Sequence, residues 1–337
     1  MGLARYVARR LLLLVPVVVG VTFITFFISR VAVPNPARAW AGLKASPETV
    51  EAYAIRYHLK EPLYIQYFYY ISDLLRGDWG ISPVNGQPVL EEIMKYFPAT
   101  IELSIVSIIL AIVIGIPLGA IAAAKQDKIE DHLIRLFALG TYSVPPFLMA
   151  LVLQLVVFYH LKLLPSGGRL SPLIDPPQHI TGLYILDSLL TMNWPALVSS
   201  IEHIILPALT LALMVFGVLT RLVRSSMLEI LRLDYIRTAR SKGLDERTVI
   251  FKHALRNALM SAVTITALIF AWMLSGAVVV EYIFNWPGIG RYAVQSILSL
   301  DLPSTMGVTI LYALTVTILN LIADITYAFL DPRVKLG

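Results

Sequence analysis

The chain has 337 residues, of which 57% are hydrophobic and only 15% are charged. Soluble domains carry about 25% charged residues, so this composition excludes an ordinary soluble enzyme or binding module and indicates a protein that is solvated mainly by lipid. Cysteine is absent, which excludes disulfides, thiol nucleophiles and cysteine metal sites.

Six apolar segments are close to the ~20 residues that a helix needs to cross about 30 Å of hydrocarbon. They are residues 11–28, 101–124, 136–161, 204–220, 258–280 and 305–329. The third contains Pro145-Pro146, which lack backbone donors and should kink or break the helix near its middle. We therefore predict an all-α, multi-pass integral protein of the cytoplasmic membrane, with about six transmembrane helices in a single domain, residues 1–337.

The first apolar segment follows Arg9 and Arg10 and so resembles a signal peptide. Its 18 residues, 11–28, exceed the ~7–15 of a signal core, and no small-residue cleavage site follows closely. We expect a retained membrane helix.

Residues 31–97 form a sizeable extracytoplasmic element between the first two predicted spans. Ser46-Pro47 and Glu61-Pro62 are typical helix starts, so we expect two short helices along the outer membrane face. An aromatic cluster follows the second start and is expected to anchor it at the headgroup level: Tyr64, Tyr67, Phe68, Tyr69 and Tyr70. A second outer loop, residues 164–200, is rich in Pro and Gly.

A polar, strongly basic stretch, residues 234–258, lies between the fourth and fifth spans. Asp234 can cap one short helix, Gly243 can end it in a left-handed conformation, and Asp245 can open the next. Two short helices joined at Gly243, within a loop of residues 223–257, would form a compact docking element. The alternative is an ordinary loop kept basic by membrane topology.

Orientation follows from the distribution of lysine and arginine. Residues 1–10, 125–135, 221–257 and 331–337 contain 3, 3, 9 and 2 of these residues, which is 17 of the 27 in the chain. The positive-inside rule therefore places both termini and the hairpin in the cytoplasm. The same bias accounts for the net charge of +5, so we expect no nucleic-acid partner.

A polar residue inside a span costs a few kcal/mol unless it faces protein or water, and the candidates for a special role are Glu102, Gln154, Asn320 and Asp324. Asn320 and Asp324 lie four apart on one helix face, near its predicted inner end. A structural role is favoured for this pair, and a place on a substrate path is the alternative.

No pattern for catalysis, cofactor binding or metal binding is present. The six histidines lack zinc-protease spacing, and neither a Gly-x-Ser-x-Gly elbow nor a phosphate-binding loop occurs. If the protein runs on ATP, another chain must hydrolyse it.

The hairpin resembles the EAA loop of ABC importer permeases, in the form found in the dipeptide/oligopeptide family. Its R-T-A-R-x-K-G-L and H-A-L-R-N-A segments correspond to residues 237–244 and 253–258. Other family-like segments cover nearly the whole chain: 6–10, 77–82, 164–168, 205–210, 281–291 and 324–333. The early first helix and large first outer segment are similar to the B-type permease of such importers.

This resemblance implies a type I ABC importer permease fold and transport by alternating access. It implies as partners a second homologous permease, two ATPase subunits that bind ATP and magnesium, and an extracytoplasmic substrate-binding protein. Ala239 and Gly243 would permit close packing and the tight turn, and the polar side chains would contact an ATPase groove. The ATPase-coupling residues carried over are Tyr235, Arg237, Thr238, Ala239, Arg240, Lys242, Gly243 and Asp245.

The chain departs from the family pattern at three places. The Glu-Ala-Ala of the general motif is replaced here by Thr238-Ala239-Arg240. The proline usual after the hairpin is replaced by Ser261, and the Pro-Gly-Asp-Pro after the first span is replaced by Val33-Pro34-Asn35-Pro36. Family frequency favours short peptides as cargo, and oligosaccharides or nickel remain alternatives. A secondary transporter or channel without ATPase partners is the alternative from another class.

Overall fold

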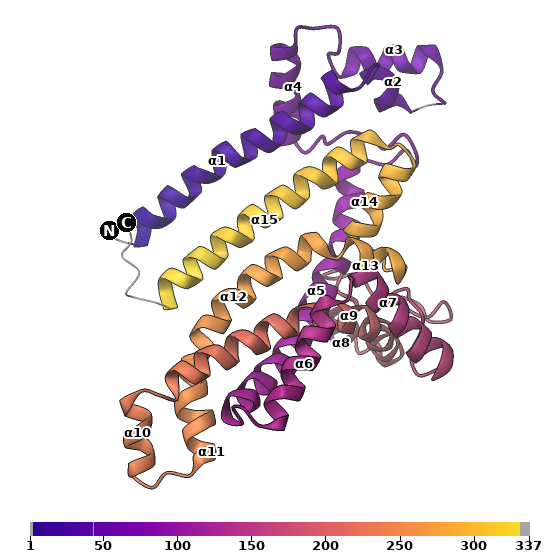
Figure 1. The fold of residues 1–337 in the computed structure, drawn as a ribbon. Helices are drawn as coiled ribbons and strands as arrows, with labels where there is room; N and C mark the ends of the chain where they lie inside the picture. The colour runs from indigo at the N-terminus through magenta and orange to yellow at the C-terminus, as the bar shows by residue number, and fades with distance from the viewer. Residues whose placement is uncertain (1–2, 43, 331–337) are drawn as a thin grey trace.

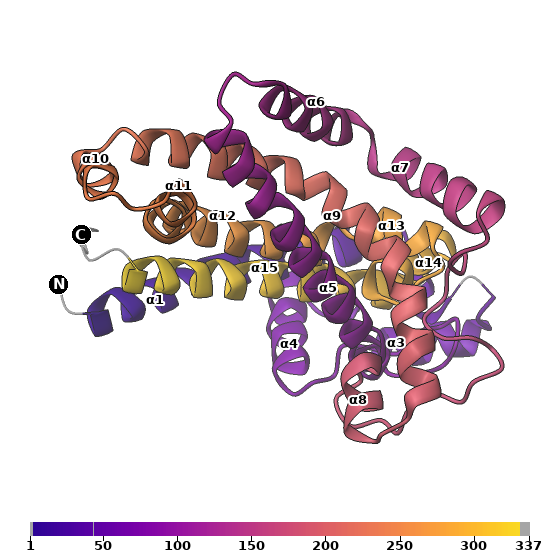
Figure 2. The same cartoon turned by 90° about the horizontal axis from the view of Figure 1, so that it is seen from below.

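The protein is a bundle of long helices in the computed structural model, which describes residues 3–42 and 44–330 (Figure 1). Among these residues the regular elements are helices, and β pairing is limited to an isolated bridge between Ile81 and Pro88. The start of α1 (Leu3–Phe27) and the end of α15 (Leu302–Leu330) lie at the same end of the bundle as α10 (Asp234–Ser241), in both Figure 1 and Figure 2. The first and last described helices therefore end near the hairpin, and the side of the membrane on which they lie stays a prediction.

In the described part of the chain, four helical segments are long and apolar enough to cross a membrane, in agreement with four of the predicted spans. They are Leu11–Ala32, which continues from α1 through the π-helix η1 (Ile28–Ala32), the helices α5 (Val89–Ala124) and α9 (Trp194–Ile230), and Leu302–Ile322 of α15. At 1.5 Å per residue, α5 and α9 are about 54 and 55 Å long. Both therefore extend well beyond the predicted spans, which included only their most apolar parts.

The third predicted span is broken, as the two prolines suggested. Helix α6 (Ile129–Ser143) ends before Val144, and α7 (Pro146–Leu153) restarts at an angle of 105° and continues as the π-helix η2 (Gln154–His160). The predicted span 258–280 falls on α12 (Leu255–Gly276) and the start of α13 (Val278–Ile283). Several side chains of α12 lie outside the described set, so its membrane crossing stays a prediction.

Helices α5 and α9 form the centre of the bundle and approach each other at two glycines. A Cβ atom on Gly119 would lie 2.7 Å from the carbonyl oxygen of Thr220, and one on Gly115 would lie 3.1 Å from that of Phe216. The Thr220 hydroxyl donates to the Gly115 carbonyl at 3.2 Å. This small-xxx-small pattern lets two backbones meet in a membrane, where the hydrophobic effect does not drive helices together.

The first outer element contains three short helices, so the expectation of two was wrong. Helices α3 (Pro47–Arg56) and α4 (Leu63–Leu75) begin at the predicted signals. The additional helix, α2 (Pro36–Ala41), begins after Asn35, whose side chain accepts from the Arg38 amide at 3.0 Å. The Asn35-Pro36 pair is the same kind of start signal as Ser46-Pro47.

The tyrosines of α4 divide between two environments. The hydroxyls of Tyr67 and Tyr70 lie 3.1 and 2.9 Å from those of Thr22 and Thr25 on α1. These two tyrosines therefore hold α4 against α1. Tyr64 is 75% exposed and remains compatible with a headgroup anchor.

Glu102 has a structural partner in the second outer loop. Two guanidinium nitrogens of Arg169 donate to its Oε2 at 3.1 and 2.5 Å, and its Oε1 accepts from the Ile185 amide at 2.7 Å. The Arg169 guanidinium also lies 3.7 Å from the ring centroid of Tyr184, at the start of α8 (Tyr184–Leu190). Buried charge is thereby paired, and the loop is fixed onto α5.

Candidate functional site

The basic hairpin, residues 234–258, projects from one end of the bundle (Figure 1). Its first limb is α10, and its second limb is α11 (Glu246–Thr248) followed by the π-helix η3 (Val249–Ala254), which continues directly into α12. The second limb is therefore the start of a long helix, and the expectation of two separate short helices was wrong. The reason is that no helix-breaking residue lies between Glu246 and Gly276.

The turn of the hairpin confirms two local predictions and corrects a third. Gly243 has φ +77°, the left-handed conformation, and a Cβ there would meet nothing within 4 Å. The Asp245 carboxylate accepts from the Thr248 amide at 2.9 Å, and these hydrogen bonds with Thr248 lower the pKa of Asp245. Asp234 is the first residue of α10 and makes no capping bond, because Leu233 occupies the cap position.

The inner face of the hairpin is packed against the rest of the chain. Ile236 and Ala239 are 0% and 8% exposed and belong to an apolar cluster with Val249, Ala254 and Met227. Ala239 therefore packs inside the chain, between α10, the second limb and the end of α9. A larger side chain at this position would separate the two limbs.

An ion pair closes the two limbs across the turn. Arg240 donates from Nε and Nη2 to the two carboxylate oxygens of Glu246 at 3.0 and 2.6 Å. The hydrogen bond from Arg240 lowers the pKa of Glu246, so the pair is ionised at neutral pH. Arg240 thus has a partner within the chain, which the resemblance to the EAA loop did not indicate.

The outward side of the hairpin is basic with apolar patches. Besides the paired Arg240, five basic side chains are exposed: Arg237, Lys242, Arg247, Lys252 and Arg256. Leu244 and Phe251 are also 41% and 44% exposed. A surface of this kind suits a groove with an apolar floor and acidic rim.

Two further predicted residues make local contacts. Tyr235 is 40% exposed, and its hydroxyl accepts from the Asn257 side chain at 2.7 Å, which links the limbs. The Thr238 hydroxyl donates to the Asp234 carbonyl at 2.9 Å, within its own helix.

A buried ion pair lies at the base of the hairpin. Arg224, on the last turns of α9, donates from two nitrogens to the two oxygens of Asp131 on α6, both at 2.7 Å. The Asp131 side chain is fully buried and also accepts from the Asp127 amide at 3.1 Å. Because these residues are far apart in sequence and share no motif, sequence reasoning missed them.

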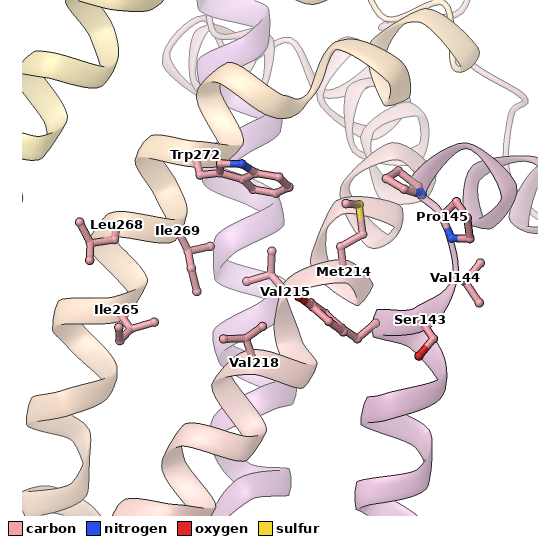
Figure 3. Close-up of a pocket in the computed structure, with 12 residues that line it drawn as sticks. Ser143, Val144, Pro145, Met214, Val215, Val218, Ile265, Leu268, Ile269 and Trp272 are labelled. Carbon is pink, nitrogen blue, oxygen red and sulfur yellow. The ribbon is translucent and has the colours of Figure 1, made fainter.

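A pocket of about 510 Å³ lies deeper in the bundle, where α6 and α7 break (Figure 3). Its walls come from the break itself, from Met214 and Val218 of α9, and from Ile269 and Trp272 of α12. The helices that carry the hairpin therefore also line this pocket.

Comparison with known proteins identifies the family. Residues 115–336 match the binding-protein-dependent transport system inner membrane component, and residues 3–104 match the N-terminal family of the corresponding membrane component. The chain belongs to this family of permeases. It is a multi-pass membrane protein, and its relatives are dipeptide and oligopeptide permeases.

Three relatives illustrate the similarity of this permease along its whole length. The chain is 44% identical over 324 residues to the probable D,D-dipeptide transport system permease protein DdpB of Escherichia coli K12, covering 96% of this chain and 95% of that one. It is 41% identical over 330 residues to the dipeptide permease DppB of Alkalihalophilus pseudofirmus, covering 98% and 99%. It is 38% identical over 334 residues to the oligopeptide permease AppB of Bacillus subtilis, covering 99% and 100%.

The polar pair of the permease's last helix is only partly described. The Asn320 side chain is exposed, and that of Asp324 lies outside the described residues. A role for either residue therefore stays a prediction.

Proposed function

We propose that this permease is a transmembrane subunit of an ATP-driven importer of short peptides. It works with a second homologous permease, two ATPase subunits and an extracytoplasmic substrate-binding protein. ATP and magnesium bind to the ATPase subunits, and the permease contributes no reacting group or cofactor site. The observation that supports this proposal most directly is the exposed basic hairpin, which is internally fixed and continuous with long helices.

The hairpin docks into a groove of one ATPase subunit from the cytoplasm. Arg237 and Lys242 contact acidic groups of the groove, while Leu244 and Phe251 contact its apolar floor. Asp245, Gly243 and the Arg240–Glu246 ion pair hold the shape of the turn, and Ala239 holds the limbs together. A hairpin fixed in this way moves as a unit with α9 and α12.

Movement of the hairpin drives alternating access. When the ATPase dimer closes, the docked hairpins approach each other and rock the attached helices, so that the path opens to the outer side. The Arg224–Asp131 ion pair joins α9 to α6 at the same level. The helices α6, α9 and α12 therefore move together with the hairpin.

Short peptides are the proposed cargo because the relatives are named as dipeptide, D,D-dipeptide and oligopeptide permeases. The cytoplasmic position of the hairpin rests on the 17 of 27 basic residues in the proposed inner segments.

The proposal is tested by affinity purification of the tagged permease in mild detergent, followed by identification of the subunits and of the solute on the binding protein. Recovery of a second permease, two ATPases and a bound peptide is expected. A bound oligosaccharide or nickel ion would overturn the proposal that the cargo is a peptide. Recovery of the chain alone, with transport that needs no nucleotide, would overturn the proposal that it is part of an ATP-driven importer.

A paired variant tests the hairpin. Arg237→Glu with Lys242→Glu reverses two exposed charges and is expected to weaken ATPase recovery about tenfold or more. The control is Arg76→Glu, an exposed arginine after α4 on the outer element, which should leave recovery unchanged. Equal recovery from both variants would contradict docking at the hairpin.

A further inference from the structure

The break between α6 and α7 removes the helical donors of two backbone carbonyls. In a continuous α-helix the carbonyls of Thr141 and Tyr142 accept from the amides of residues 145 and 146. Both positions are proline, which has no N–H. Val144 is extended, with φ −82° and ψ 128°, and the helix restarts at Pro146. The chain thus presents carbonyl acceptors that its own helix does not use.

These carbonyls lie at an apolar depth. The pocket at the break is also lined by Met214 and Ile269, which are close to the middle of the predicted spans 204–220 and 258–280. An unsatisfied carbonyl at such depth costs about 1–3 kcal/mol, and irregular backbone is tolerated there only against protein or a water-filled cavity. The site therefore needs hydrogen-bond donors.

The remaining pocket wall is apolar. Figure 3 shows Met214, Ile269 and Trp272 around the space opposite the break. Among the described residues that line the pocket none is charged, and the Ser143 hydroxyl already donates to the Leu139 carbonyl at 2.8 Å. The volume of about 510 Å³ is within the ~300–1,000 Å³ of small-ligand sites.

We propose that this pocket is a passage subsite for an apolar residue of the transported peptide. The apolar side chain lies against Ile269 and Trp272, and an amide or ammonium N–H of the peptide donates to the carbonyl of Tyr142, the one of the two residues that lines the pocket. Water satisfies this carbonyl when no cargo is present. The inference rests on the proposed function and adds to it a preference for neutral, apolar side chains.

Other occupants fit the chemistry less well. A lipid acyl chain has no donor and would leave the Tyr142 carbonyl unsatisfied. A helix of the second permease uses its backbone N–H groups internally. A peptide brings both an apolar side chain and free N–H groups, and discontinuous membrane helices commonly form substrate sites in transporters.

The test uses the complete importer in proteoliposomes, with uptake of Phe-Ala and Gly-Ala measured in competition. Val218→Phe fills the pocket and is expected to lower the Phe-Ala to Gly-Ala uptake ratio about tenfold. The matched control is Val113→Phe, at a 62% exposed position of α5 outside the pocket, which should leave the ratio unchanged. An unchanged ratio in Val218→Phe, with the complex intact, would overturn the subsite.

A second measurement covers the case in which Val218→Phe fails to assemble. Because the chain has no cysteine, Leu268→Cys in the pocket wall is a unique label site. We expect a water-soluble maleimide to react there, and Phe-Ala with its binding protein to slow the reaction. Slow labelling regardless of peptide would indicate lipid or a partner helix and would overturn the subsite. A wild-type importer that takes up neither peptide overturns the proposed function itself.

Discussion

Arg240 and Glu246 face each other across the turn at Gly243, with two guanidinium nitrogens 3.0 and 2.6 Å from the two carboxylate oxygens. Both side chains come from the exposed end of the basic hairpin, 42% and 56% exposed. The pair therefore adds little to global stability, yet it fixes how the two limbs meet. The shape of the hairpin is therefore fixed by contacts within this chain.

Glu246→Gln should separate these two effects. We expect the free energy of unfolding to fall by less than about 1 kcal/mol, since exposed ion pairs contribute little. ATPase recovery should fall several-fold, because a flexible hairpin loses entropy on docking. Glu51→Gln is the matched control, since Glu51 pairs with Lys60 at a similarly exposed outer site. Equal effects of the two substitutions on ATPase recovery would contradict a role of the Arg240–Glu246 pair in docking.

The ion pair also predicts a pH dependence. Arg240 holds the pKa of Glu246 below its usual value of 4.5, so the pair contributes above that value and is lost as the pH falls through the lowered pKa. A spin label on Lys242→Cys, a unique site in this cysteine-free chain, should show constant mobility from pH 6 to 8. Mobility should rise only below pH 4.5. In Glu246→Gln it should be high at every pH, and a wild-type transition near neutrality would contradict the assignment.

Gly243→Ala tests the left-handed turn. Because a Cβ would meet nothing within 4 Å, the cost comes only from φ +77° and should be about 1 kcal/mol. Gly243→Asn should cost less, since asparagine tolerates this conformation better. Thermal unfolding of the detergent-solubilised permease measures both. A larger effect for Asn than for Ala would show that the turn is not left-handed.

Gly119→Val tests the contact between α5 and α9. The new side chain would begin 2.7 Å from the Thr220 carbonyl oxygen, so the helices must separate, at about 1–3 kcal/mol or more. Gly20→Val, on α1, is the control, because its Cβ would meet nothing within 4 Å. Thermal unfolding should distinguish the two, and equal midpoints would contradict the packing.

The Glu102–Arg169 pair predicts non-additive substitutions. The side chains are 5% and 8% exposed, so Glu102→Gln alone, which leaves a buried guanidinium unpaired, should cost about 3 kcal/mol. Adding Arg169→Met removes that charge and should restore part of the loss. Protease cleavage within residues 170–180 provides the measurement. Additive effects in the double variant would mean that the two residues do not interact.

Apolar length and local start signals predicted much of the fold. Ser46, Gly243 and Asp245 act locally, through bonds to residues within three or four positions, and the sequence was sufficient for them. The local effect of proline likewise predicted the break between α6 and α7 at Pro145. It failed at Asp234, because Leu233 takes the cap position and α10 begins one residue earlier than an Asp234 cap would place it.

Features that depend on distant residues could not be predicted. Arg224 was counted only among the lysines and arginines of the proposed inner segments, and neither Asp131 nor Arg169 was singled out. Their pairing is set by how α5, α6 and α9 cross, which depends on glycine contacts such as Gly119 with Thr220. Likewise, the sequence identified Ala239 only as a motif residue, and the packing of the two limbs shows that its side chain is buried within the hairpin.

Helix α9 is continuous over about 55 Å, so it can act as a rigid lever, and the basic hairpin lies just beyond its C-terminal end. Its fulcrum lies about two-thirds of the way along the helix, where Phe216 and Thr220 contact the glycines of α5. A tilt of about 5° around that point would displace the Trp194 end by roughly 3 Å and the Ile230 end by roughly 1.5 Å, in opposite directions. The outer loop that starts α9 would then swing one way as the hairpin swings the other.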